Sequence, residues 1–73
     1  MAVDVKSEIT GNVWKVVAAV GDEIPEDEPV MILESMKMEI PVGVPQDGVV
    51  TEILVSEGDT VSEGTVVARI NPS

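Results

Sequence analysis

The sequence contains no cysteine, histidine, tyrosine or phenylalanine, and Trp14 is its one aromatic residue. Without cysteine and histidine, the chain cannot form a disulfide, a Ser-His-Asp or Cys-His triad, or the usual zinc site. It also lacks the aromatic surface on which single-stranded nucleic acids stack. These absences argue against a hydrolytic or thiol-redox enzyme, and they leave valine, isoleucine, leucine, methionine and alanine to build the core.

Basic residues are scarce as well: four lysines and arginines face fourteen acids, which gives a net charge of −10. A nucleic acid or an anionic membrane surface would repel such a chain, so we expect neither as a partner. A basic patch on a partner protein would attract it, and faster at low salt. The acids of the segment 22–28 lack the spacing of a calcium loop, so we expect a solvated turn and no metal site there.

No apolar run approaches the roughly 20 residues of a membrane-spanning helix, and no secretory signal is visible at the N-terminus. These features predict a cytoplasmic location. The 73 residues are enough for one small domain, and 44% of them are hydrophobic, too many for a disordered chain. We therefore expect residues 1–73 to fold as a single domain with a thin core.

The chain repeats itself at an offset of 37 residues. Glycines and apolar residues carry most of the identities, and these are the positions that set backbone shape. Two copies are too few for a solenoid, but they can form two related β-layers facing each other across a pseudo-twofold axis. The identical pairs are Gly11/Gly48, Val13/Val50, Gly21/Gly58, Asp22/Asp59, Glu26/Glu63 and Val30/Val67.

Each copy consists of short β-branched stretches separated by Gly-Asp turns, with no sustained helical period. This predicts an all-β fold of about eight short strands, as two four-stranded antiparallel sheets in a flattened barrel or sandwich. Two registers are open for the first strand of each copy. Strict alternation turns Trp14, Val16, Ala18 and Val20 inward, with Val49, Thr51, Ile53 and Val55 in the second copy. A β-bulge would instead turn Val13, Val16 and Ala18 inward, with Val50, Ile53 and Val55.

Between the two copies lies the segment Glu34-Ser35-Met36-Lys37-Met38-Glu39. If strands flank it, the chain reverses at Met36-Lys37, where a two-residue turn would require positive φ in residues other than glycine or asparagine. Such a departure from local preference is typical of functional sites. The alternative is one helical turn that ends at Pro41 and leaves Lys37 as an ordinary solvated lysine.

The same segment resembles the Ala/Ser-Met-Lys-Met attachment motif of biotinyl domains. The frame around it is also similar to the biotin/lipoyl attachment family, through Gly11-Asn-Val-Trp, Gly21-Asp22, Gly48-Val-Val and Gly58-Asp59. The overall match is closest to the stand-alone biotin/lipoyl attachment proteins of bacteria. Ser35 replaces the usual alanine, and there is no inserted "thumb". Lipoyl domains carry Asp-Lys-Ala where Met36 and Met38 stand, so the motif favours biotin over lipoate.

The resemblance implies a biotinyl domain over residues 1–73, with biotin attached to Lys37 at an exposed hairpin by biotin protein ligase. Glu34, Ser35, Met36 and Met38 are the candidate residues around the site. The domain would not be catalytic itself; it would shuttle carboxybiotin between biotin carboxylase and carboxyltransferase active sites. Two alternatives stay open: a carrier of lipoate or of either group, and an unmodified β-module that only binds another protein.

Overall fold

The computed structural model describes residues 2–73, and within them the regular elements are all β-strands. β-branched residues are frequent in the strands, and the prolines lie in loops, at the ends of strands or in the edge strand β5, where a missing N–H costs little. The predicted all-β fold of eight short strands is confirmed. The strands are β1 (Val3–Lys6), β2 (Gly11–Val16), β3 (Glu23–Ile24), β4 (Pro29–Ser35), β5 (Met38–Gly43), β6 (Gly48–Ile53), β7 (Thr60–Val61) and β8 (Val66–Pro72).

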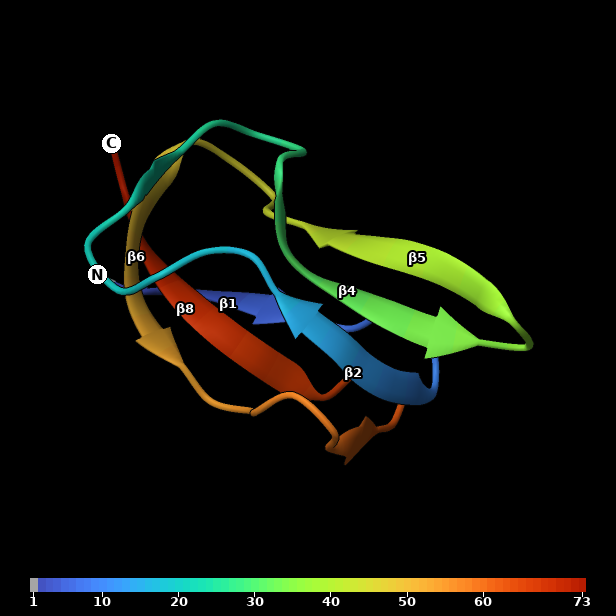
Figure 1. The fold of residues 1–73 in the computed structure, drawn as a ribbon. Helices are drawn as coiled ribbons and strands as arrows, with labels where there is room; N and C mark the ends of the chain where they lie inside the picture. The colour runs from blue at the N-terminus through green and yellow to red at the C-terminus, as the bar shows by residue number, and fades with distance from the viewer. Residues whose placement is uncertain (1) are drawn as a thin grey trace.

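The strands form two four-stranded antiparallel sheets that pack face to face (Figure 1). One sheet has the order β1-β8-β6-β3 and the other β5-β4-β2-β7. Extended by the flanking strands β1 and β5, the two copies comprise β1–β4 and β5–β8, so each sheet takes two strands from each copy and neither copy forms a layer by itself. The reason is that consecutive strands alternate between the sheets, except where the β4–β5 hairpin keeps the chain in the same sheet.

The pseudo-twofold symmetry of the repeat extends to individual hydrogen bonds. Gly21 N–H donates to the carbonyl of Val50 at 2.7 Å, and its counterpart Gly58 N–H donates to the carbonyl of Val13 at 2.8 Å. Both glycines have positive φ, 99° and 94°. The carboxylate of Asp22 accepts from the backbone N–H three residues earlier at 2.9 Å, as Asp59 does in the second copy. The Gly-Asp pairs are therefore the turns that the sequence predicted, and each turn also ties one copy to the other.

β-bulges determine the register of the two long inner strands. The pairing of β2 with β4 shifts between Val13 and Lys15, and the pairing of β6 with β8 shifts between Val50 and Glu52. Val13 and Val50 are consequently buried, whereas Trp14 is 45% exposed. Of the two registers that the sequence left open, the bulged one is correct, because strict alternation would have placed Trp14 in a core too thin to hold it.

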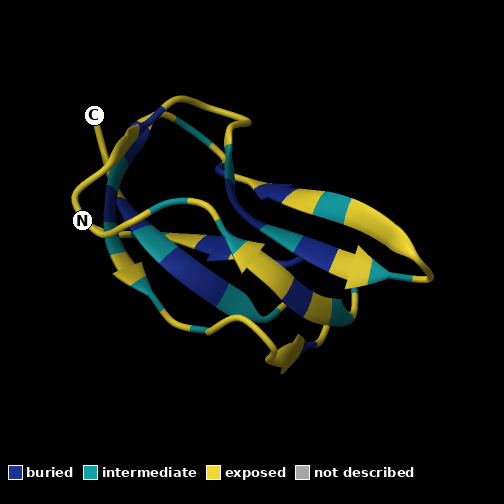
Figure 2. Ribbon diagram, viewed as in Figure 1, coloured by how far each residue is buried: buried dark blue, intermediate teal, exposed yellow. Residues whose placement is uncertain are grey.

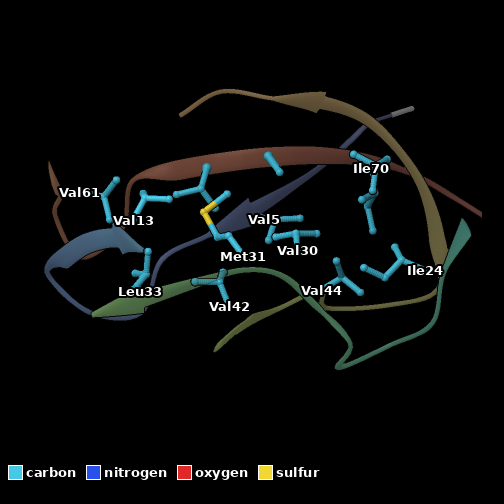
Figure 3. Close-up of a cluster of buried hydrophobic side chains, with 13 residues drawn as sticks. Val5, Val13, Ile24, Val30, Met31, Leu33, Val42, Val44, Val61 and Ile70 are labelled. Carbon is cyan, nitrogen blue, oxygen red and sulfur yellow. The ribbon is translucent and has the colours of Figure 1, made fainter. Parts of the chain in front are cut away.

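The core is a single aliphatic cluster between the two sheets (Figures 2 and 3). It contains no aromatic side chain, in agreement with the composition. Val16 and Ile53, which both registers placed inward, are half-buried and pack against it. The buried members are Val5, Val13, Ile24, Val30, Met31, Leu33, Val42, Val44, Val50, Val61, Val67, Ala68 and Ile70.

The molecule is elongated, with extents of 34 × 17 × 16 Å. The β4–β5 hairpin projects at one end of the long axis, while the start of β1 and the end of β8 lie toward the other end (Figure 1). Among residues 2–73 the structure contains no helix of the length and apolarity needed to cross a membrane.

Close backbone contact at the start of β6 predicts a stability effect at Gly48. A Cβ at this position would lie 2.5 Å from the carbonyl oxygen of Asn71, so Gly48→Ala should destabilise the fold by about 1–3 kcal/mol. Urea unfolding measures the loss. Gly64→Asn is the control: its φ of 87° is strained for a side chain, but nothing lies near the new Cβ, and Asp27 tolerates a φ of 71° at the equivalent position. The control should lose only about 1 kcal/mol. Equal stability of Gly48→Ala and wild type would contradict the close contact.

Backbone strain in the β4–β5 turn predicts that a better turn former stabilises the protein. Met36 has a φ of 51°, and asparagine adopts such angles more readily than methionine. Met36→Asn should therefore raise the free energy of unfolding by about 0.5–1 kcal/mol in urea. Met38→Asn, in the regular part of β5, should bring no gain. A loss of stability in Met36→Asn would show that the methionine at position 36 is held for packing.

Candidate functional site: the hairpin tip

Met36 and Lys37 form a two-residue turn between Ser35 and Met38, the last cross-strand pair of β4 and β5. Both turn residues have positive φ, 51° and 64°, as a hairpin turn of this length requires. The chain reverses at the residues that the sequence indicated, so the helical-turn alternative is wrong. Non-glycine residues in this conformation cost on the order of 1–2 kcal/mol each, and the hairpin carries two of them in succession.

The tip extends beyond the core, which leaves its side chains in solvent (Figure 2). Met36 is 88% exposed and Met38 58% exposed, and Lys37 between them is exposed too. Strand alternation places Ser35 and Met38 on the face of the sheet that bears buried Leu33. Ser35 is half-buried, but Met38 lies past the edge of the core. The structure thus brings three of the candidate residues, Ser35, Met36 and Met38, together around the amine of Lys37.

Glu34, the fifth candidate residue, stands opposite Glu39 across the hairpin. Both carboxylates are exposed. Like charges directly opposite each other on a sheet destabilise it by a few tenths of a kcal/mol. The hairpin therefore carries, one residue pair below its tip, two negative charges that the fold does not require.

The four basic side chains differ in their surroundings. Arg69 makes both ion pairs found among residues 2–73, to Asp4 at 3.0 Å and Glu52 at 3.4 Å. Its hydrogen bonds to these two carboxylates, that to Asp4 foremost, raise the pKa of Arg69 above its ordinary value. The ammonium of Lys15 lies 5.6 Å from the centre of the Trp14 ring. Lys6 and Lys37 make neither kind of contact, and of these two Lys37 is the one at the hairpin tip, where its amine has no partner within the described chain.

Gly11 anchors the hairpin from the neighbouring strand β2. A Cβ at Gly11 would lie 2.8 Å from the carbonyl oxygen of Glu34 and 3.4 Å from the Cβ of Ser35. Close approach of β2 to the end of β4 thus depends on the absence of a side chain. Sequence reasoning had not included Gly11 among the site residues. The signal was present in the repeat, since Gly48 makes the equivalent approach to Asn71, the counterpart of Glu34.

The described part of the chain offers no candidate metal site beside the amine. Residues 2–73 contain no cluster of three acidic side chains placed to hold a metal ion. What remains is a single primary amine at the end of a rigid β-structure, flanked by two long apolar side chains. Such an arrangement can present the amine to the active site of another enzyme, and an acyl group attached to it would project away from the domain.

Comparison with known proteins agrees with this geometry. The family model described as "Biotin-requiring enzyme" (Biotin_lipoyl) matches residues 2–70. The chain is 45% identical over 69 residues to the biotin/lipoyl attachment protein of Bacillus subtilis, which covers 94% of each chain. It is 44% identical over 71 residues to the biotinylated protein TB7.3 homolog of Mycobacterium leprae, covering 97% of this chain and 100% of the relative.

A solved structure has the same fold. The urea carboxylase of Kluyveromyces lactis superposes with a TM-score of 0.92 at 45% identity, over 97% of this chain and 6% of the much longer enzyme. The match of the family model over nearly the whole sequence and the two relatives of similar length establish that this chain belongs to the biotin/lipoyl attachment family.

Proposed function

We propose that this protein is a biotin carrier, with residues 1–73 as its biotinyl domain and Lys37 as the attachment residue. The observation that carries the proposal is the position of Lys37: its amine stands at the apex of a strained two-residue turn, between exposed Met36 and Met38. The two relatives that match along 94% and 100% of their length are named for biotin/lipoyl attachment or biotinylation. The methionines favour biotin over lipoate as the attached group.

The attachment reaction is acyl transfer to the Lys37 amine. In its unprotonated form the Nζ atom attacks the carbonyl carbon of biotinyl-adenylate, which a biotin protein ligase supplies. An amide bond forms, the acyl–phosphate bond breaks, AMP leaves with the bonding electrons, and the amine loses a proton to a base of the ligase or to water. The domain contributes presentation: the turn holds the amine clear of the sheets, so the ligase can enclose the tip without unfolding the hairpin.

The residues at the tip fit an attached biotin. The amine has no competing ion pair within the described chain, and no neighbouring side chain covers it. When bound, biotin supplies a ureido nitrogen that accepts and releases a carboxyl group. Lys37 holds the group on a long flexible side chain, Met36 and Met38 provide an apolar surface at its root, and the sheets keep that root in a fixed place. Tethering raises the local concentration of the group at any active site within reach.

The partners in this account are enzymes that load and unload the arm. A biotin carboxylase and a carboxyltransferase carry out the chemistry, and the domain itself performs no catalytic step. Two curated relatives, a pyruvate carboxylase and an acyl-coenzyme A carboxylase subunit, and the urea carboxylase structure carry a similar domain as a small part of a longer chain. Here the hairpin lies at the opposite end of the molecule from the start of β1, so the tip can enter an active site while the rest of the domain stays outside (Figure 1).

Replacing Lys37, whose amine would accept the biotinyl group, tests the attachment residue. Co-expressed with an active biotin ligase, the wild-type protein should bind avidin on a blot and gain the mass of one biotinyl group. Lys37→Arg should lose both signals, because a guanidinium is not acylated under these conditions, whereas Lys15→Arg, also exposed, should keep them. An avidin signal that survives in Lys37→Arg would contradict the assignment. Supplying lipoate and a lipoate ligase instead should leave the mass unchanged, and a lipoyl adduct would favour the alternative carrier.

The negative charge just below the hairpin tip predicts that recognition by the ligase depends on salt. The net charge of −10 and the Glu34–Glu39 pair should attract a ligase surface that is basic, so the kcat/KM of biotinylation should fall several-fold between about 0.05 and 0.5 M salt.

Two double variants separate the contribution of the Glu34–Glu39 pair from that of the net charge of the protein. Glu34→Gln with Glu39→Gln should lower kcat/KM at low salt while stabilising the fold by a few tenths of a kcal/mol, because the cross-strand repulsion is relieved. Glu26→Gln with Glu28→Gln removes the same charge from exposed positions between β3 and β4 and should change kcat/KM much less. Equal losses from both pairs would assign the effect to net charge alone.

A further inference from the structure

Strands β5, β4 and β2 lie side by side in the sheet that carries the hairpin (Figure 1), and three apolar side chains form a row on the outer face of these strands. Both neighbours of Ile32 in β4 are buried in the core, so Ile32 itself points outward, where it is half-buried. Exposed Pro41 of β5 pairs with Ile32 on one side. On the other side, the bulge of β2 sets Lys15, with Trp14 next to it, opposite Ile32. We call Trp14, Ile32 and Pro41 the outer row.

The internal repeat places the equivalent row on the opposite sheet, with different chemistry. The positions equivalent to Trp14, Lys15, Ile32 and Pro41 are Thr51, Glu52, Arg69 and Asp4. Arg69 pairs across the strands with Asp4 and Glu52, and it makes its two ion pairs with these same residues, at 3.0 and 3.4 Å. The row on that sheet is thus closed by its own charges. The backbone frame therefore does not require apolar side chains in this row.

Trp14 has no role in the core that would explain its presence. It is 45% exposed, and Thr51 fills the equivalent place in the other bulge. Tryptophan is one of the side chains that most often anchor protein interfaces, because the indole buries a large area in a pocket of the partner. A half-exposed indole beside Ile32 and Pro41 thus points to another protein that covers the outer row.

The charges around the outer row define the partner that fits it. The cross-strand pair Glu34–Glu39 stands two residues closer to the tip than the pair Ile32–Pro41, on the same face of the sheet. Lys15 lies beside the row, with its ammonium 5.6 Å from the centre of the indole ring, and it makes no ion pair within residues 2–73. A complementary partner has an apolar pocket for the indole, basic side chains toward the two glutamates and an acceptor for the lysine.

An enzyme that acylates Lys37 has to recognise more than the amine. Lys6, Lys15 and Lys37 are all exposed and carry the same primary amine, so selection among them depends on the surface around each. Enzymes that act on the attached group can hold that group itself. The outer row lies roughly 14–17 Å from the tip, at about 3.4 Å per residue along β4. An interface of standard size, about 800 Å² per partner, is about 30 Å across, so an enzyme that encloses the tip covers the row in the same contact.

We infer that the outer row is a docking surface for the enzyme that acylates Lys37. The indole of Trp14 enters an apolar pocket of that enzyme, and Ile32 and Pro41 extend the apolar contact. Basic side chains of the enzyme meet Glu34 and Glu39. The inference rests on the proposed function and adds to it the surface by which the domain is held. Recognition uses the outer face of one sheet, and the opposite face, whose row is closed by ion pairs, stays outside the contact.

Fluorine nuclear magnetic resonance of the indole tests the contact without a substitution in the row. Trp14 is the one tryptophan of the chain, so 5-fluorotryptophan gives a single resonance. Lys37→Arg is used because it cannot be acylated, and unlabelled biotin protein ligase is added together with biotin and ATP. The resonance should shift or broaden as the ligase is added, and it should not respond to lysozyme, a basic protein with no such pocket.

Three results of the fluorine experiment would overturn the inference. One is an unchanged resonance at a ligase concentration that saturates binding. Another is a resonance that responds only to a biotin carboxylase, which would assign the row to a different partner. The third is a resonance that responds only to a higher concentration of the domain itself, which would assign the row to a second copy of this chain.

Steady-state kinetics tests the same contact by substitution. Trp14→Thr, which copies the residue of the other bulge, should raise the KM of biotinylation about ten- to thirtyfold and change kcat less than about twofold, because the contact is present in ground and transition states alike. Trp14→Phe keeps an aromatic ring and should raise KM only about two- to fivefold. Leu54→Thr, an exposed apolar residue beside β8 on the opposite sheet, is the matched control and should keep the wild-type KM. A wild-type KM in folded Trp14→Thr would contradict the inference.

The two measurements also separate this inference from the proposed function. If the wild-type protein gains the mass of one biotinyl group while the fluorine resonance and the KM of Trp14→Thr stay unchanged, the proposed function stands and the docking surface is wrong. If the wild-type protein gains no such mass, the proposed function fails, and the docking surface that rests on it fails too.

Discussion

The close approach of β2 to the end of β4 is the contact on which the position of the amine depends. At Gly11 the absence of a side chain lets the carbonyl of Glu34 come within 2.8 Å of where a Cβ would stand. This contact holds the last residues of β4 against an inner strand of the sheet, and the strained turn follows directly. Two consecutive residues with positive φ are unfavourable in isolation, and they persist because the strands on both sides are held in register.

The repeat explains how so small a chain forms a frame that can hold the strained turn in place. Each copy alone contributes a few short strands with too little apolar surface for a core, but each sheet takes two strands from each copy, so neither half can fold without the other. The Gly-Asp turns reinforce the exchange, since Gly21 and Gly58 donate to carbonyls of the opposite copy. The repeat builds the frame, and the β4–β5 hairpin lies where the symmetry of the repeat is broken.

Local sequence signals predict much of this fold. Matching glycines and valines at an offset of 37 residues predicted the repeat, the turns and the number of strands. The strand register could not be chosen, because a bulge differs from strict alternation by one residue, and the choice depends on whether the thin core can hold Trp14. The exchange of strands between sheets was also missed, since pairing between distant segments leaves no local pattern.

The turn at Met36-Lys37 contradicts local preference, so composition left hairpin and helix open, and resemblance to a motif decided between them. Gly11 was missed as a site residue because its role is a contact with a strand that is distant in sequence.

The charge and the exposure of the hairpin suit it to recognition by another protein. The acidic surface attracts a basic partner, the paired glutamates stand below the tip, and Met36 and Met38 present apolar surface that the core does not use. The central claim is that this arrangement serves a covalent bond at one nitrogen atom. Tandem mass spectrometry of proteolytic peptides from ligase-treated protein tests it most directly, since the chain has three lysines to choose from. The account predicts biotin on the peptide fragment that contains Lys37, with Lys6 and Lys15 unmodified; biotin located on either of those two lysines, or on none, would contradict it.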